Sequence, residues 1–122
     1  MVPELPAYAA KIGKEIAGFV SFTEMDDALI IAALGTLPQF QNAGVGRSLI
    51  EKIEAEARRR KKTRLLVSTS NDDLPALAFY QLLGFQIYEV KPNVIVEKHG
   101  RVQEGMGGLP VRDEIRLRKN LN

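Results

Sequence analysis

The chain has 122 residues, of which 45% are apolar and 26% charged, as is ordinary for a folded domain. A chain of this length is expected to form a single domain, 1–122, because it is too short to bury two separate cores. It has no cysteine and one histidine, His99, which excludes thiolate chemistry, disulfides and multi-histidine metal centres, so no metal site is expected. The net charge of +2 is too small to indicate a nucleic-acid partner.

The first third of the chain predicts an antiparallel meander of three strands, over residues 7–12, 15–24 and 28–37. The third strand is apolar at nearly every position, which indicates a strand in the middle of the sheet with both faces covered. Pro38 has no amide hydrogen to donate to a ladder, so this strand is expected to end there.

The clearest helix is predicted over residues 44–61. Its core-facing residues are spaced four apart and are Val45, Leu49, Ile53 and Ala57. The opposite side is expected to be solvated, with ion pairs that support the helix and carry no function, Glu54 with Arg58 and Glu56 with Arg60. The basic run 58–64 suits either nucleic-acid binding or a solvated helix end, and the lack of interleaved aromatic residues favours the helix end.

The second half of the chain predicts further alternation of strands and helices. The expected elements are a strand over 64–70, a helix from a cap at 71–73 to Leu83, a strand over 85–90 and a half-exposed strand over 111–118. Residues 91–110 are rich in glycine and charged residues, and no helix or strand is predicted there. The strand, helix and strand over 28–70 form a crossover, so their two strands are expected to be parallel. The fold class is therefore α/β (α+β), a mixed, mainly antiparallel sheet with helices packed on it.

Residues 41–48, Gln-Asn-Ala-Gly-Val-Gly-Arg-Ser, connect a buried strand to the long helix. Backbone N–H groups without partners and the positive end of a helix gather at such a junction. The two glycines would let a phosphate approach the backbone, and Arg47 would add positive charge. The same glycines also suit a tight turn that packs on the sheet, so both interpretations remain. The segment does not fit the Walker loop or the dinucleotide fingerprint, because required glycines are missing.

The pattern Gln-x-x-Gly-x-Gly after a buried strand resembles the acyl-CoA pyrophosphate loop of the GNAT superfamily of N-acetyltransferases. The helix after the next strand also resembles this family, with Ala-x-x-Phe-Tyr at 76–80 and Leu-Gly-Phe at 83–85. The resemblance implies a GNAT-like sheet whose central parallel pair splays apart for acyl-CoA. It also implies an enzyme that moves an acetyl group from acetyl-CoA, its cosubstrate, to a primary amine of a small molecule or protein. The amine would attack directly in a ternary complex.

The resemblance also implies roles for individual residues. Tyr80 matches the family's tyrosine that is proposed to protonate the departing thiolate; the alternative is an aromatic side chain that only packs on the sheet. Asp73 stands where the family often has asparagine, so it either contacts the pantetheine arm or only caps the helix. The cofactor-binding residues implied are Leu34, Gly35, Thr36, Gln41, Asn42, Ala43, Gly44, Val45, Gly46, Arg47, Ser48, Asn71 and Asp73.

A catalytic base is not identified by the sequence. Ser68 stands where some members of the family carry a glutamate, and Glu24, Glu97 and His99 are candidates only by proximity. A chain of water molecules would serve equally well.

Family members usually have a strand and two helices before the meander, which this sequence does not contain. We expect a second subunit, in a homodimer, or residues 91–110 to supply the missing part of the acceptor wall. The alternative function is a non-catalytic acyl-CoA-binding or regulatory module. A cytoplasmic location is expected, because the sequence has no cysteine, secretory signal or bilayer-spanning segment.

Overall fold

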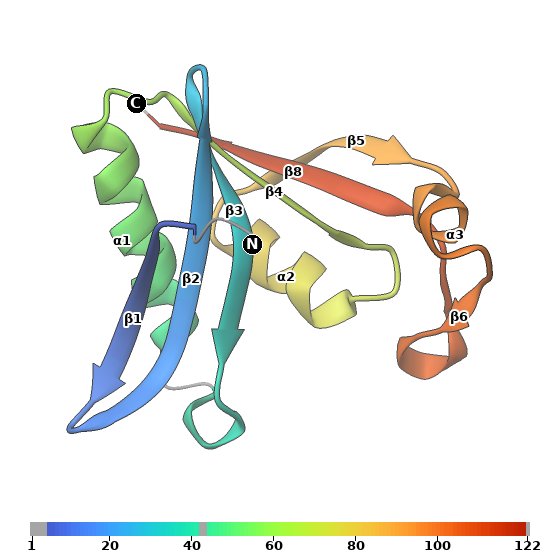
Figure 1. The fold of residues 1–122 in the computed structure, drawn as a ribbon, viewed down its shortest axis with the longest axis horizontal. Helices are drawn as coiled ribbons and strands as arrows, with labels where there is room; N and C mark the ends of the chain where they lie inside the picture. The colour runs from blue at the N-terminus through green and yellow to red at the C-terminus, as the bar shows by residue number, and fades with distance from the viewer. Residues whose placement is uncertain (1–4, 42–43, 122) are drawn as a thin grey trace. The chain divides into compact units, whose positions relative to one another are not determined.

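The computed structural model describes residues 5–41 and 44–121, and its contacts group them into two compact units. The first unit ends at Leu65 and also includes residues 120–121, and the second comprises residues 66–119. Strand pairing orders six strands as β1-β2-β3-β4-β8-β5 and joins β6 and β7 in a separate hairpin (Figure 1). The predicted mixed sheet with helices packed on it is therefore confirmed.

The first unit is an antiparallel meander packed against one long helix. Its elements are β1 (Ala7–Ile12), β2 (Glu15–Met25), β3 (Ala28–Thr36), the short 3-10 helix η1 (Pro38–Phe40) and α1 (Val45–Arg59). All three strands lie within one residue of their predicted bounds, and α1 contacts each of them. The four apolar residues predicted to form the inner face of α1 are buried.

Gly18 of β2 sets how closely the start of α1 approaches the sheet. A Cβ atom at Gly18 would lie 2.6 Å from the carbonyl oxygen of Gly35 and 2.9 Å from Cγ1 of Val45. Only glycine therefore fits at this position without a shift of the helix or of β3. The side chains of Val45 and Leu49 at the beginning of α1 therefore pack directly on the backbone of Gly18.

The second half of β3 departs from the prediction that both of its faces are covered. Ile31 is buried, whereas Ala32 and Ala33 are exposed. Ser21 of β2 pairs with Ala33 and the next residue, Phe22, pairs with Ile31, so Ala32 is an extra residue and forms a β-bulge. A bulge bends its strand and increases the local twist, and continuous apolar sequence gives no sign of it.

The second unit contains the rest of the sheet and the shorter helices. Its main elements are β4 (Arg64–Ser70), which begins in the first unit, α2 (Leu74–Leu82), β5 (Gln86–Lys91) and β8 (Glu114–Asn120). Gly84 has φ of +97° after α2, and the amide of Phe85 donates to the carbonyl oxygen of Tyr80 at 3.0 Å. The predicted end of this helix, at a left-handed glycine, is thereby confirmed.

Residues 92–113, named the lobe below, contain elements that the sequence did not predict. They are α3 (Val94–His99), β6 (Gln103–Glu104), the 3-10 helix η2 (Met106–Gly108) and β7 (Pro110–Val111). Because Val111 belongs to the β6–β7 hairpin, the last long strand begins only at Glu114. The predicted strand over 111–118 was therefore placed three residues too early at its start.

Candidate active site

The N-terminus of α1 begins at a glycine, which has no side chain to cap the helix. Gly44 is the N-cap residue with φ of +78°, a left-handed conformation that glycine adopts without strain. In the described part of the chain no side chain caps this helix, and its first turn contains no acidic residue. A Cβ atom at Gly44 would have no described atom within 4 Å. These features fit a phosphate group, which needs free N–H groups and room beside them.

The remaining residues of the predicted phosphate loop are only partly covered by the structure. Asn42 and Ala43 lie outside the described residues. Gln41 is exposed and follows η1, where its amide donates to the carbonyl oxygen of Pro38 at 3.3 Å. Ser48 is exposed and donates its amide to Gly44, and Arg47 forms an exposed ion pair with Glu51, with Nε 3.6 Å from Oε1.

The end of β3 is half-buried at all three predicted cofactor-binding positions, Leu34, Gly35 and Thr36. Gly35 pairs with Phe19 of β2, and a Cβ atom at Gly35 would lie 2.6 Å from Cε1 of the Phe19 ring. The ring therefore covers the space that a side chain at this position would fill. This contact explains the glycine without reference to a ligand, so a role in cofactor binding stays a prediction.

Tyr80 lies on α2 with only 7% of its surface exposed. Its ring meets the rings of Phe79 and Phe85 edge to face, with centroids 5.2 Å and 5.3 Å apart. Burial, together with the negative charge of Asp73, raises the pKa of the Tyr80 hydroxyl to about 12. The phenol is therefore protonated over the whole physiological pH range, and it is a weaker acid than an exposed tyrosine.

Asp73 caps α2, as predicted. Its Oδ1 accepts a hydrogen bond from the amide of Ala76 at 3.2 Å, and the hydroxyl of Thr69 donates to Oδ2 at 3.4 Å. The carboxylate thus already occupies the positive end of this helix. A contact between Asp73 and the cofactor stays a prediction.

The side chain of Asn71 is engaged by the lobe, which the sequence did not indicate. Its Nδ2 donates to the carbonyl oxygen of Pro110 at 2.9 Å, and its Oδ1 accepts the amides of Arg112 and Asp113, both at 2.9 Å. These bonds use the amide group of Asn71 within the protein. No signal in the sequence could have found them, because the partners are about forty residues away and are backbone atoms.

The structure does not favour any of the candidate bases. Glu24 contacts Arg60 at 3.0 Å and Lys62 at 2.8 Å, and the bond from Lys62 is the main cause that lowers the pKa of its carboxyl group. A carboxylate stabilised in this way is a weak base. Glu97 and His99 are exposed on α3, and Ser68 is exposed on β4.

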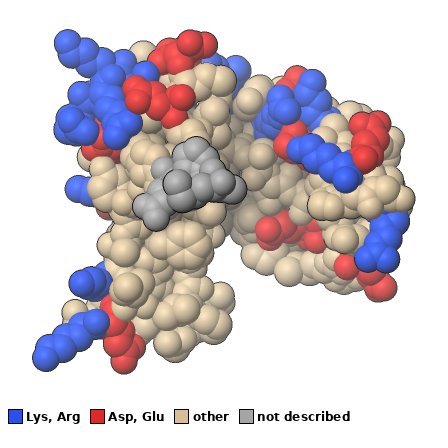
Figure 2. Space-filling view, viewed as in Figure 1, with Lys and Arg blue, Asp and Glu red and all other residues tan. Residues whose placement is uncertain are grey.

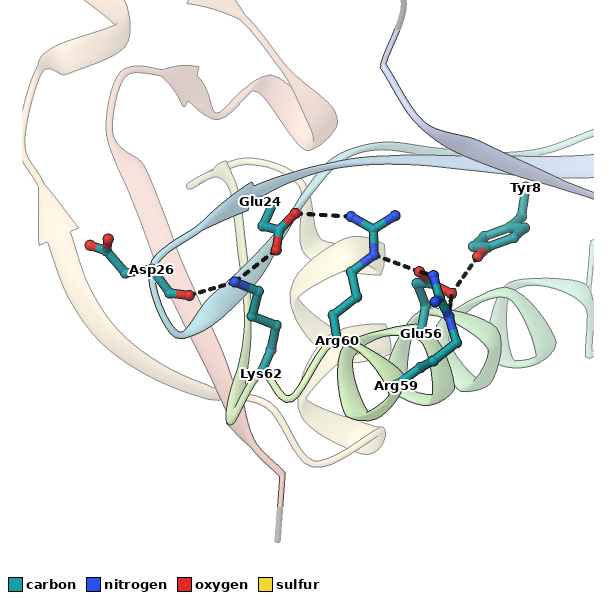
Figure 3. A network of polar contacts seen from close by, with 7 residues as sticks. All are labelled: Tyr8, Glu24, Asp26, Glu56, Arg59, Arg60 and Lys62. Atoms are coloured by element: carbon teal, nitrogen blue, oxygen red, sulfur yellow. Dashed lines mark hydrogen bonds and ion pairs between the residues drawn. The ribbon is translucent and has the colours of Figure 1, made fainter.

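Glu56 on α1 is buried, so the prediction that it lies on a solvated face was wrong. It accepts hydrogen bonds from the Tyr8 hydroxyl and from Arg59 Nε, each at 2.9 Å, and it is also paired with Arg60 (Figure 3). These bonds, those of the arginines first, lower the pKa of Glu56 to about 2. Its ionised form therefore ties the C-terminal half of α1 to β1.

The basic run over residues 58–64, which begins in the last turn of α1, is largely neutralised by neighbouring carboxylates. The ion pairs join Arg58 to Glu54, Arg59 and Arg60 to Glu56, Lys62 to Glu24 and Arg64 to Asp27. Figure 2 shows acidic side chains beside the basic ones that gather at the upper left of the view. This pairing favours a structured helix end over a nucleic-acid surface.

Two further properties concern only residues 5–41 and 44–121. No three His, Asp or Glu side chains among them are grouped so that they could hold a metal ion. None of their helices is both long and apolar enough to cross a bilayer.

Comparison with known proteins identifies the family. The chain matches the acetyltransferase (GNAT) family over residues 2–85. It is 33% identical to the protein YdhI of Bacillus subtilis, over 95% of this chain and 74% of that protein. It is 26% identical to the [ribosomal protein bS18]-alanine N-acetyltransferase of Escherichia coli, over 81% of this chain and 66% of that enzyme.

Among solved structures, the chain is similar to a GNAT family acetyltransferase from Elizabethkingia anophelis with acetyl-CoA bound. The TM-score is 0.86 at 26% identity, over 94% of this chain and 75% of that one. The chain belongs to the acetyltransferase (GNAT) family. It is therefore an acyltransferase, and acetyl-CoA is its cosubstrate.

Proposed function

We propose that this protein is an N-acetyltransferase that transfers the acetyl group of acetyl-CoA to a primary amine of a small molecule or protein. The amine attacks the thioester directly, in a ternary complex, without a covalent enzyme intermediate. The observation that carries the proposal is the buried Tyr80, whose hydroxyl stays protonated at every working pH. Such a hydroxyl is suited to give a proton to a departing sulfur.

Cofactor binding in this proposal depends on the N-terminus of α1. The amides of residues 45–47 precede the first intrahelical bond, which Ser48 donates to Gly44. They would hold the diphosphate, and acetyl-CoA would supply a thioester whose acetyl group is open to attack. Backbone groups at the end of β3 would hold the pantetheine arm, since main-chain pairing does not depend on the side chains there.

The raised pKa of Tyr80 limits how proton transfer takes place. A tyrosine with a pKa of about 12 is about 3.5 units above a model thiol of about 8.5, so a stepwise transfer in water would cost about 5 kcal/mol. An exposed phenol, with a pKa of about 10, would reduce this cost to about 2 kcal/mol. Burial also raises the pKa of a thiol, so the cost falls when the sulfur is desolvated beside the hydroxyl. We therefore expect the proton to move as the carbon–sulfur bond breaks.

Replacement of Tyr80 by phenylalanine tests this function. Tyr80→Phe removes the hydroxyl and keeps the ring, so we expect kcat to fall about a hundredfold or more while the Kd for acetyl-CoA changes less than about twofold. Thiol release from acetyl-CoA with a panel of primary amines measures kcat, and calorimetry measures Kd.

The matched control is Tyr88→Phe, which removes a hydroxyl from β5, where Tyr88 is 39% exposed and stacks with Arg118. We expect this variant to retain normal turnover. If Tyr80→Phe turns over normally, Tyr80 has no role in proton transfer. If the unaltered protein binds acetyl-CoA and releases no thiol with any amine, it is instead the acyl-CoA-binding module considered as the alternative. The homodimer and the cytoplasmic location stay predictions.

A further inference from the structure

The lobe is attached to the rest of the second unit through the turn between β4 and α2. Asn71 in this turn binds three backbone groups of the lobe with its side chain, and its own amide donates to the carbonyl oxygen of Asp113 at 3.0 Å. One side chain therefore satisfies the carbonyl group of Pro110 and the amide groups of Arg112 and Asp113. These are groups that water would otherwise have to solvate.

A second contact joins the same turn to the tip of the β6–β7 hairpin. Oδ2 of Asp72 accepts the amide of Met106 at 3.4 Å. A Cβ atom at Gly105 would lie 2.1 Å from this oxygen, so only glycine allows the hairpin to come so close. The turn thus holds the lobe at two separate places, one near each end of the β6–β7 hairpin.

Hydrogen bonds within the lobe hold residues 112–113, the segment to which the Asn71 side chain binds. Asp113 accepts the amide of Asn93 at 2.9 Å and contacts Arg112, and the amide of Ile95 donates to the carbonyl oxygen of Arg112 at 3.0 Å. The start of α3 therefore moves with residues 112–113. A change at Asn71 would shift α3 and the hairpin together.

The turn that holds the lobe is also the turn that starts the helix of Tyr80. Asp73 caps α2 two residues after Asn71, and Tyr80 follows on the same helix. The lobe exposes apolar side chains to solvent, with Val102 56%, Met106 48% and Leu109 38% exposed. The four-residue turn Ser70–Asp73 is thus the common anchor for the lobe and for the helix that carries Tyr80.

We infer that Asn71 is a positioning residue for the amine acceptor: its three side-chain hydrogen bonds set the lobe against the start of α2, and binding of the acceptor depends on that setting. The inference rests on the proposed function. It differs from the role that the family resemblance implies for Asn71, a contact with the cofactor. The two roles predict changes in different constants, the KM for the amine and the Kd for acetyl-CoA.

Two substitutions at Asn71 separate these roles. Asn71→Leu removes all three side-chain hydrogen bonds, whereas Asn71→Asp keeps an oxygen for the amides of Arg112 and Asp113 and loses only the donation to Pro110. We expect the KM for the amine to rise about tenfold in Asn71→Leu and about threefold in Asn71→Asp. The Kd for acetyl-CoA and kcat should stay within about twofold of the unaltered values.

Gly105→Ala probes the same attachment from the lobe side, without a change in the turn. Its methyl group would push against Asp72, so we expect a rise in the KM for the amine with no change in the Kd for acetyl-CoA. The control is Gln81→Leu, because the Gln81 side chain is exposed and, among residues 5–41 and 44–121, donates to the carbonyl oxygen of Leu77 in its own helix. Gln81→Leu should leave both constants unchanged.

The amines used are leucinamide, glycinamide and spermidine, with thiol release as the assay and thermal unfolding as a check on folding. A rise in the Kd for acetyl-CoA in both Asn71 variants, with the KM for the amine unchanged, would overturn the inference in favour of cofactor contact. If Asn71→Leu does not fold, the inference is tested with Asn71→Asp and Gly105→Ala. Normal KM values for the amine in both of these variants would overturn it. If the unaltered protein acetylates none of the amines, the proposed function itself fails.

Discussion

The helices α1 and α2 begin in opposite ways. At α1 the N-cap is Gly44, without a side chain, and no acidic residue lies in the first turn among the described residues. At α2 the N-cap is Asp73, whose carboxylate accepts the amide of Ala76. A helix N-terminus stabilises negative charge placed beside it, and the N-terminus of α2 already stabilises the carboxylate of Asp73. The capacity of this helix to stabilise an anion therefore contributes to its own folding. At α1 no described side chain uses this capacity, as the proposed diphosphate site requires.

This difference matches the chemistry proposed for each helix. The proposed diphosphate site needs unoccupied amides, and no described side chain caps the start of α1. The negative charge of Asp73 helps to keep the buried phenol of Tyr80 protonated, and it also makes that phenol a weaker proton donor. In the proposed function, the same structural position, the start of a helix after a strand, serves anion binding in one case and proton retention in the other.

The largest effect is expected when α1 receives the cap that α2 has. Gly44→Asp places a carboxylate where the diphosphate is proposed to bind, and Gly44→Asn is the uncharged control; both residues tolerate φ of +78° better than other side chains do. We expect Gly44→Asp to bind acetyl-CoA about 2 kcal/mol more weakly than Gly44→Asn, roughly thirtyfold in Kd.

The same pair of variants should respond in the opposite sense in stability. A carboxylate near a helix N-terminus is favourable, so the Tm of Gly44→Asp should equal or exceed that of Gly44→Asn. Calorimetry with acetyl-CoA and thermal unfolding without it provide the two measurements. Equal Kd values in the two variants would show that the diphosphate does not bind at this helix.

A smaller effect is expected when α2 loses its cap. Asp73→Ala removes the acceptor for the amide of Ala76, so we expect the free energy of unfolding to fall by about 1 kcal/mol. Asp73→Asn keeps a capping oxygen and removes only the charge, so its stability should be nearly normal. Urea denaturation of both variants measures the difference, and equal losses would mean that the charge, not the cap, stabilises α2.

Asp73→Asn also tests the electrostatic part of the comparison. The negative charge of Asp73 disfavours the phenolate form, so its removal should move the pKa of Tyr80 downward from about 12. Tyr80 ionisation, followed by ultraviolet absorbance with Tyr80→Phe as the reference, reports this change. At pH 7 the Tyr80 hydroxyl remains protonated with either residue at position 73. Ionisation of Tyr80 should therefore cause no change in the pH–rate profile below about pH 10.

The smallest effect is expected at Arg47, in the first turn of α1. Its guanidinium contacts Glu51 at 3.6 Å, and both side chains are about 70% exposed, so water and salt screen its charge. We expect Arg47→Ala to weaken acetyl-CoA binding about twofold. Glu51→Gln is the control, because it keeps Arg47 and removes its partner. If Arg47→Ala lost more affinity for acetyl-CoA than Gly44→Asp does, the Arg47 side chain, and not the backbone, would have the main role in binding.

Local chemistry explains which elements could be predicted from the sequence. The bounds of the meander and of α1 follow from turn residues, from Pro38 and from apolar spacing, all of which act within a few residues. Gly84 predicted the end of α2 because a left-handed residue there is a local requirement. The Asp73 cap was predicted on the same basis.

Features that depend on distant partners could not be predicted. The elements of the lobe are only two to six residues long and are held by Asn71, Asp72 and Asp113 through backbone groups, which have no sequence signature. The exposure of Ala33 depends on a bulge at Ala32, and alanine is common in both settings. The burial of Glu56 could not be predicted without knowing that Tyr8, Arg59 and Arg60 all contact its carboxylate.

The bond between Tyr8 and Glu56 also bears on the order in which the chain folds. It spans 48 positions, whereas the β2–β3 hairpin and α1 are built from neighbours in sequence. Closing a loop of this length costs about 3.4 kcal/mol of free energy through lost chain entropy. The bond adds net stability only when other contacts have already offset this cost. The bond between Tyr8 and Glu56 is therefore expected to form late, after the local β1–β2 hairpin and the helix have formed, and its loss should be an early event in unfolding.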